Sequence, residues 1–427
     1  MTTFSKDKDN KAFCILPFVH TYLNTEGDVF PCCISWDPQR NTRIGFLKDN
    51  SLEELFNSDK MKQLRVDLAA GIRRPDFCNA CYKREDNGFV SARHGNNLDY
   101  VDVEDEIVAS MHEDGYLEPN IKSWDIRFSN LCNLKCRTCG SVYSTTWAQE
   151  DAIFNEANKD SIHQQIHSIP EGAPDPLENQ YDNVDKIYFA GGEPLIMPEH
   201  FRVLQKIIDS GRAHKVKLLY NTNMTKLNYN RHDLIEYWKQ FKIVVLGASI
   251  DAIGERANYI RNGVKWSNIE KNLKTLSEAI KKYDNINIHI APTVSILNVH
   301  SLTDTHRYFV EQGYIPSASA IVLNILLDPS YYEIKNLPEI LKEEVKEKVR
   351  NHLIWLKEQN AHHHVLESFE SILTYISNEA SEKEAIKFVN ETHRIDSRRN
   401  QSFPDTFPEY AEWWYSLNNS IISVSNI

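Results

Sequence analysis

The residues of this chain whose types and spacing could do chemistry are its eight cysteines. All of them lie in the first third of the sequence, and no cysteine follows Cys139. A disulfide framework would be spread through a secreted fold, and disulfides rarely persist in a reducing compartment. Thiolates gathered in this way therefore favour metal binding over the alternative of incidental buried thiols.

The most compact group is the segment Cys132-Asn-Leu-Lys-Cys136-Arg-Thr-Cys139. Three closely spaced thiolates can hold three irons of a cubane iron–sulfur cluster and leave the fourth iron without a protein ligand. A structural zinc site would normally close with a fourth Cys or His nearby, and none is placed for it. The spacing therefore predicts a [4Fe–4S] cluster with one iron open to a small molecule.

This CxxxCxxC loop after a strand resembles the signature of the radical SAM superfamily. A second element fits the same family: Phe189-Ala-Gly-Gly-Glu-Pro-Leu195 ends the second predicted strand. The resemblance implies that the segment lies beside the methionine end of S-adenosylmethionine (SAM), where glycines let the backbone approach the ligand. The residues concerned are Gly191, Gly192, Glu193 and Pro194. Taken alone, the segment could be an ordinary turn.

Further cofactor positions follow more loosely from the same resemblance. Residues at the ends of the fourth to sixth strands would bind the ribose, carboxylate and adenine of SAM, or would simply cap those strands. These candidates are Ser249, Asp251, Arg261, Ser295, Asn298 and Leu326. Thr138 is a departure, since many members carry an aromatic residue there that contacts adenine.

The N-terminal cysteines resemble the auxiliary-cluster domains called SPASM and twitch. Cys14 is followed by Gly27, then by Cys32 after four intervening residues, and later by a Cys-x-x-Cys pair. The resemblance implies one auxiliary [4Fe–4S] cluster held by Cys14, Cys32, Cys78 and Cys81. The usual order is changed, because these domains commonly follow the barrel. Cys33 could be a spare thiol, a neighbour or the true ligand, and a zinc ribbon is the alternative for the set.

The elements that must position these residues alternate between strands and helices from about residue 121 onward. Apolar spacing indicates helices around Phe201–Ile208 and Ile269–Ile280. Six β-α units in series predict an α/β fold with a parallel sheet, and the resemblance implies a partial (β/α)6 TIM-like barrel. The candidate strands are Ser123–Phe128, Lys186–Ala190, Val216–Tyr220, Ile243–Ser249, Ile286–Val294 and Ala320–Leu326.

Two flanking regions complete the predicted organisation. Residues 1–110 form the auxiliary-cluster domain, residues 111–335 the barrel, and residues 336–427 a helical C-terminal extension. Within the first, we expect a hairpin of Phe18–Tyr22 and Val29–Phe30. We also expect a helix that begins with the capping box of Ser51 and Glu54 and continues towards Leu68.

Composition limits the function classes. The net charge of −12 argues against a nucleic-acid carrier. The sequence shows neither an apolar membrane span nor a signal peptide, so we expect a cytoplasmic enzyme.

By resemblance, the enzyme cleaves SAM to a 5′-deoxyadenosyl radical that abstracts hydrogen from a substrate, with an electron donor such as flavodoxin or ferredoxin. The auxiliary cluster and the scarcity of spare thiols favour oxidation or cross-linking of a peptide or protein. Dehydrogenation or epimerisation of a sugar, cyclitol or other small molecule is the alternative, and a zinc-stabilised binding protein without catalysis is another.

Overall fold

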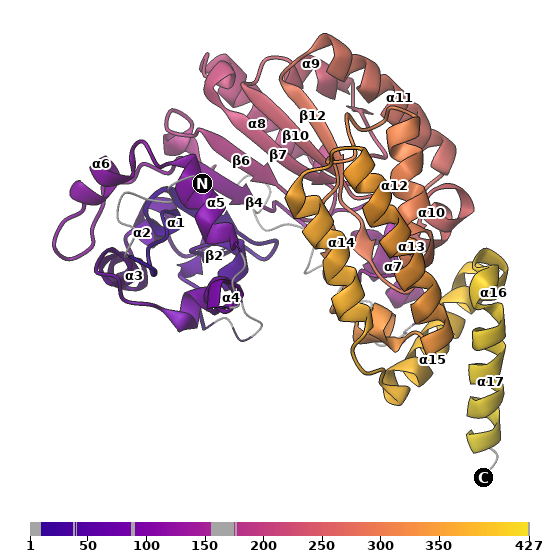
Figure 1. The fold of residues 1–427 in the computed structure, drawn as a ribbon. Helices are drawn as coiled ribbons and strands as arrows, with labels where there is room; N and C mark the ends of the chain where they lie inside the picture. Colours follow the sequence, from indigo (N-terminus) through magenta and orange to yellow (C-terminus); the bar gives the residue numbers. More distant parts are fainter. Residues whose placement is uncertain are drawn as a thin grey trace. The chain divides into compact units, whose positions relative to one another are not determined.

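The structure, a computed structural model, describes residues 10–36, 39, 41–86, 90–154, 175 and 177–425 (Figure 1). Its main element is an eight-stranded sheet with the order β12-β10-β7-β6-β4-β1-β2-β3. The strands are β1 (His20–Leu23), β2 (Asp28–Phe30), β3 (Gly45–Phe46), β4 (Ser123–Ile126), β6 (Lys186–Phe189), β7 (Lys217–Thr222), β10 (Ile243–Ala248) and β12 (Ile286–Ile290). Parallel pairing of β4 with β6 and of β6 with β7 confirms the predicted α/β class.

The chain divides into two compact units. The first comprises residues 1–131, 155–220 and 240–244, and the second comprises residues 132–154, 221–239 and 245–427. The division runs through strands β7 and β10, so it follows a different line from the predicted bounds at residues 110 and 335. Those bounds remain a prediction.

The N-terminal hairpin of the first unit forms as predicted, although its first strand begins at His20 and not at Phe18. The preceding residues make a single helical turn, α1 (Leu16–Val19). Asn24 organises the hairpin turn, because its side-chain oxygen accepts hydrogen bonds from the backbone N–H groups of Glu26 and Asp28. Gly27 has a φ of +87°, a conformation that favours glycine.

The first strand of this hairpin also joins the barrel strands. β1 pairs with β4 in parallel, in the register His20–Ser123 to Leu23–Ile126. The Nδ1 atom of His20 lies 2.9 Å from the Ser123 hydroxyl across this pair. The N-terminal segment therefore extends the sheet that begins the barrel.

Short helices and an apolar cluster support the cysteines of the first unit. The helices are α2 (Leu52–Phe56), α3 (Asp59–Ala69), α4 (Pro75–Asp86), α5 (Ala92–Asp99), α6 (Glu104–Ala109) and α8 (Pro198–Asp209). Ser51 and Glu54 form the predicted capping box. The predicted continuous helix is wrong, because α2 ends at Phe56, with Asn57 as its C-cap, and Ser58 precedes a new helix.

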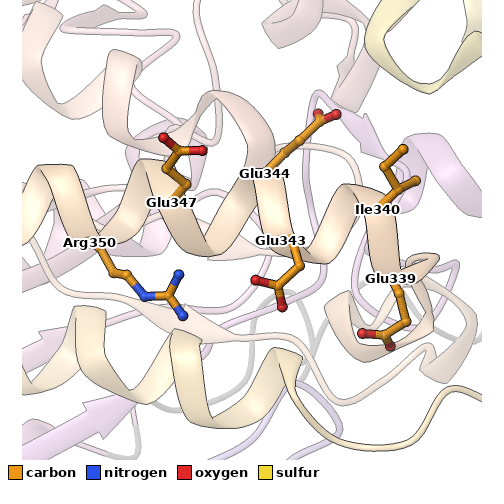
Figure 2. A pocket seen from close by; sticks show the side chains of 6 residues that line it. All are labelled: Glu339, Ile340, Glu343, Glu344, Glu347 and Arg350. Atoms are coloured by element: carbon orange, nitrogen blue, oxygen red, sulfur yellow. The ribbon is translucent and has the colours of Figure 1, made fainter.

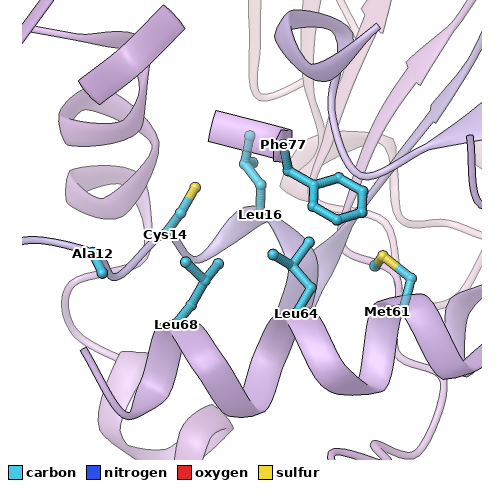
Figure 3. Close-up of a cluster of buried hydrophobic side chains, with 7 residues drawn as sticks. All are labelled: Ala12, Cys14, Leu16, Met61, Leu64, Leu68 and Phe77. Carbon is cyan, nitrogen blue, oxygen red and sulfur yellow. The ribbon is translucent and has the colours of Figure 1, made fainter. Parts of the chain in front are cut away.

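Figure 3 shows the apolar cluster along one face of α3. Leu64 and Leu68 are fully buried there, and Cys14 and Phe77 pack in the same cluster. This face holds the chain segments that carry the N-terminal thiols.

Helix α8 covers one face of the first unit's sheet. The rings of Phe189 on β6 and His200 on α8 lie 4.8 Å apart, edge to face. Trp124 and Ile187, which pair across β4 and β6, are fully buried. Side chains alternate along a strand, so the neighbours of Trp124 along β4 and of Ile187 along β6 point to the opposite face of the sheet.

The second unit carries the end of the barrel. Its helices include α7 (Thr145–Phe154), α9 (Leu234–Trp238), α10 (Gly254–Ile260), α11 (Trp266–Lys282) and α12 (Leu302–Glu311), and the two-residue strands β8 (Asn228–Tyr229) and β9 (His232–Asp233) pair with each other. The apolar side chains of Ile269, Leu273 and Leu276 on α11 are buried, as their spacing predicts.

The predicted fifth and sixth strands are shorter than expected. The fifth is divided into β12 and β13 (Thr293–Val294) around Pro292, which has no backbone N–H to donate. The sixth is reduced to β14 (Asn324–Ile325), which pairs with β13 in parallel, and to one bridge between Ile290 and Ile321.

The C-terminal region is helical, as predicted. Its helices are α13 (Glu339–Glu358), α14 (His363–Ile376), α15 (Glu382–Arg399), α16 (Phe403–Thr406) and α17 (Ala411–Ser425). Helices α13 and α14 lie side by side (Figure 1). Figure 2 shows the exposed, mostly acidic face of α13 around Glu343 and Glu347. None of the helices in the described ranges combines the length and apolarity that a bilayer crossing needs.

Candidate cluster and cofactor site

The three-cysteine loop lies in the second unit and is held from two sides. β5 (Lys135–Cys136) pairs antiparallel with β11 (Arg261–Asn262), so that Cys136 lies opposite Arg261. The backbone N–H of Arg137 donates to the Ile260 carbonyl at 2.8 Å. On the other side, the indole of Trp147 on α7 donates to the Cys136 carbonyl at 2.7 Å. These bonds fix the loop around its central cysteine.

The thiols of this loop are set in a low-dielectric environment. Burial raises the pKa of Cys136, while the nearby Arg261 guanidinium lowers it. Burial, together with Cys136, raises the pKa of Cys139 to about 12. Buried thiols of this kind become thiolates when a metal offsets the cost of the charge. The donor set therefore suits an iron–sulfur cluster.

A polar network connects Cys136 to the predicted SAM positions. Arg261 Nη1 lies 3.7 Å from the Cys136 sulfur, and Arg261 Nε lies 2.8 Å from Asp251 Oδ2. Asp251 Oδ1 accepts the backbone N–H of Thr293 at 2.8 Å. Asn298 Nδ2 donates to the Asp251 carbonyl at 3.2 Å.

The same asparagine completes the network. Its side-chain oxygen accepts the backbone N–H of Ser295 at 2.8 Å. The Ser295 hydroxyl is buried and has no hydrogen-bond partner among the described residues. Four predicted positions, Asp251, Arg261, Ser295 and Asn298, are therefore brought together.

For three other predicted SAM positions, the structure shows only a backbone hydrogen bond or the degree of burial. Leu326 is buried, and its N–H donates to the Val294 carbonyl at 3.0 Å. The N–H of Ser249 donates to Thr222 at the end of β7. Thr138 lies half-buried in the cysteine loop. Their contact with SAM stays a prediction.

The Gly-Gly-Glu-Pro segment belongs to the first unit and packs tightly against the chain that leads to Cys132. Gly192 N donates to the Ser129 carbonyl at 3.2 Å, and Glu193 N donates to the Leu131 carbonyl at 2.8 Å. Gly191 has a φ of +112°. Pro194 opens a short turn, and the buried Glu193 carboxylate accepts the N–H of Leu195.

The four predicted auxiliary cysteines lie in the first unit, where Cys14 is part of the apolar cluster and Cys32 and Cys78 pack against it. Burial raises the pKa of Cys14, and the charges of Cys32, Cys78 and Cys81 raise it further. Burial also raises the pKa of Cys78 to about 12, with Cys32 and Cys81 acting in the same direction. Such a set is destabilised as bare thiolates and is stabilised by a metal centre. Across the described ranges, no group of three or more Cys, His, Asp or Glu side chains has the geometry of a ready-made site for a metal ion.

Cys33 points to different neighbours. Burial raises the pKa of the Cys33 thiol, and the charge of the nearby Asp125 carboxylate raises it further. Cys32 packs against the apolar cluster that contains Cys14, and the choice of Cys32 over Cys33 as ligand stays a prediction.

Sequence reasoning missed a charged group on the sheet face opposite α8. Asp125 is only 2% exposed, and it lies in register between Tyr22 on β1 and Tyr188 on β6. The Nε atom of Arg127 lies 3.5 Å from its carboxylate. Burial raises the pKa of Asp125. A carboxylate inside an apolar strand, Ser123-Trp-Asp-Ile126, was the available signal.

Comparisons with known proteins bear on the same two regions. The sequence profile of the radical SAM superfamily matches residues 126–301, and that of the SPASM iron–sulfur cluster-binding domain matches residues 14–82. No curated protein matches the chain.

The solved structures that the chain resembles are distant. anSMEcpe with bound AdoMet and Cp18Cys peptide is 19% identical, over 55% of this chain and 60% of that one, with a TM-score of 0.37. Streptococcus suis SuiB bound to S-adenosylmethionine is 15% identical, over 86% of this chain and 76% of that one, with a TM-score of 0.36. The first match thus spans less than two thirds of its counterpart.

Proposed function

Because the chain belongs to the radical SAM superfamily and carries a SPASM domain ahead of the superfamily domain, we propose that it is an enzyme that oxidises or cross-links a peptide or protein. The two domains imply [4Fe–4S] clusters and SAM. When bound, these groups supply a 5′-deoxyadenosyl radical that removes a hydrogen atom from the substrate. The protein's own residues hold these groups and shield the radical.

Cys132, Cys136 and Cys139 would hold the first cluster. Arg261 and Asp251 support the assignment of the neighbouring residues to SAM, because Arg261 bridges Cys136 and Asp251. The unpartnered, buried hydroxyl of Ser295 offers a polar contact in the same network. These residues would orient SAM against the cluster and exclude water from the reacting atoms.

The observation that supports the proposed oxidation is the packing of Cys32 and Cys78 against the apolar cluster that contains Cys14, with Cys81 one helical turn after Cys78 on α4. Removal of a hydrogen atom leaves a substrate radical, which must lose one more electron to become a closed-shell, oxidised product. A second cluster can accept that electron, while a base or solvent takes the proton. Oxidation or bond formation follows without a thiol that returns a hydrogen atom.

Two other activities remain as candidates. A sugar, cyclitol or other small molecule could replace the peptide as substrate of a dehydrogenase or epimerase, and for the epimerase Cys33 would be the available hydrogen donor. A non-catalytic zinc protein would use the same N-terminal thiols.

The test uses the anaerobically reconstituted protein with a chemical reductant and SAM. We expect about eight iron atoms per chain, as two [4Fe–4S] clusters require, and the formation of 5′-deoxyadenosine. Zinc without iron, and no deoxyadenosine, would show that the radical-enzyme proposal is wrong.

A second measurement concerns the electron acceptor. In the Cys14→Ala and Cys81→Ala variants, deoxyadenosine should still form while the oxidised product is lost. A control variant, Cys33→Ala, should keep the iron content. If Cys14→Ala and Cys81→Ala still give the full yield of product, the auxiliary cluster does not accept the electron.

A further inference from the structure

The C-terminal helix α15 reaches the three-cysteine loop through buried charged side chains, all within the second unit. The Arg137 side chain, two residues before Cys139, is fully buried and forms an ion pair with Asp396 of α15. Its guanidinium also lies 3.6 Å from the ring centre of Tyr259. A buried arginine needs such partners, because a desolvated charge without them is costly.

Asp396 connects three parts of the unit. One carboxylate oxygen accepts the Tyr259 hydroxyl at 2.8 Å as well as the Arg137 guanidinium. The other accepts the backbone N–H of Phe403 at 2.7 Å. The carboxylate is thus fully used in ordering the cysteine loop, helix α10 and the start of α16.

A second contact from α15 holds the residue before Cys136. Arg399 Nη1 donates to the Lys135 carbonyl at 2.9 Å, and its Nη2 donates to Glu150 on α7 at 2.9 Å. Lys135 itself pairs with Glu150. The Arg399 guanidinium stacks over Trp147, the residue whose indole donates to the Cys136 carbonyl.

We propose that α15 is a positioning element for the cluster, with Asp396 and Arg399 as positioning residues that act through Arg137 and Lys135. The two loop residues next to Cys136 are each fixed by a side chain of α15, and Cys136 is fixed by Trp147. The helix therefore sets where the central thiolate stands relative to Arg261. The positioning of the loop does not depend on the proposed function, whereas the expected effect on SAM binding rests on it.

The variants Asp396→Asn and Arg399→Lys test the proposal. The first keeps the shape of the side chain but removes the charge opposite Arg137. The second keeps the positive charge but loses the planar guanidinium that bonds Lys135 and Glu150 together. Arg394→Gln is the matched control, because Arg394 lies on the same helix and pairs with Glu391 within it.

The first readout is amide hydrogen exchange of the apo protein. We expect the Arg137 amide, bonded to Ile260, to exchange about tenfold faster or more in Asp396→Asn, because a charge-assisted bond that orders the loop is weakened. Arg399→Lys should show the same effect at Cys136 and Arg137, and Arg394→Gln should match the wild type.

The second readout is the electron paramagnetic resonance spectrum of the reduced, reconstituted protein with and without SAM. The SAM-dependent change in the spectrum should be diminished in both α15 variants and unchanged in the control. Exchange and spectra that equal those of the wild type in both variants would overturn the proposal.

Global destabilisation is separated from loop positioning by the exchange of distant amides, such as those of α11, which only global unfolding would accelerate. If wild-type protein cleaves no SAM while the loop amides still respond, the proposed function fails and the positioning role stands.

Discussion

Gly192 offers the sharpest test of how the Gly-Gly-Glu-Pro segment packs against the chain that leads to Cys132. A methyl group at this position would lie 2.2 Å from the Leu131 carbonyl oxygen, 2.6 Å from its carbon and 2.7 Å from the Asn130 carbonyl carbon. All three are backbone atoms, so no flexible side chain can move aside. We therefore predict that Gly192→Ala forces the two segments apart.

The magnitude follows from the contacts that must change. Overpacking of this kind costs about 1–3 kcal/mol. Separation of the segments also strains the bonds from Gly192 N to Ser129 and from Glu193 N to Leu131, each worth about 1 kcal/mol. We expect the free energy of unfolding to fall by about 3 kcal/mol in total.

Urea denaturation of the apo protein measures this change, and calorimetric titration of the reconstituted protein measures SAM affinity. Leu131 directly precedes Cys132 in the chain, so we also expect weaker SAM binding. The matched control is Gly95→Ala on α5, where an added methyl meets no atom within 4 Å. That change should stabilise the helix by up to about 1 kcal/mol. A Gly192→Ala variant with wild-type stability and affinity would refute the reasoning.

Three further predictions concern stability. Burial, reinforced by Lys186, lowers the pKa of His20 to about 3. The unfolded state therefore binds the extra proton as pH falls below about 6.5, so the contribution of His20 to the free energy of unfolding should drop by up to about 1.4 kcal/mol per pH unit towards pH 4. In denaturation curves of the apo protein, His20→Gln should flatten this pH dependence, whereas His363→Gln, at an exposed side chain, should leave it unchanged. Arg65 is fully buried and donates to the carbonyls of Pro17, Phe56 and Gly115, so Arg65→Lys should lower the free energy of unfolding by about 2–4 kcal/mol; an unchanged urea midpoint would contradict this. Leu68→Ala, in the cluster of Figure 3, should cost about 2–5 kcal/mol, and a loss below about 1 kcal/mol would mean that the site collapses around the cavity.

Elements with local causes were predictable from the sequence. The capping box at Ser51 and the apolar spacing of α11 depend on residues within a few positions, and both are confirmed. Strands β4, β6, β7 and β10 are short apolar runs, and their ends agree with the predicted ones within two residues. Pro292, by contrast, was visible in the fifth predicted strand, and its missing N–H explains the break that was not predicted.

The neighbours of the site residues depend on long-range packing, which no spacing in the sequence encodes. The CxxxCxxC pattern identifies Cys136 but says nothing of Asp396, which lies 259 residues from Arg137 along the chain. The spacing of the charged residues in α15 does not show which of them are buried, and only the fold shows that Asp396 and Arg399 are turned into the protein. The placement of Cys32 with the other N-terminal thiols, and of Cys33 with Asp125, likewise depends on how the hairpin packs.

The parallel pairing of β1 with β4 makes the changed domain order physically reasonable. A SPASM domain that precedes the barrel must approach it from the first strand, and β1 does so by adding directly to β4. Cys33 follows the end of β2 by three residues, and burial together with the Asp125 carboxylate raises the pKa of its thiol. The adjacent residues Cys32 and Cys33 therefore have different surroundings: Cys32 packs against the apolar cluster that contains Cys14, whereas Cys33 lies within the electrostatic influence of Asp125.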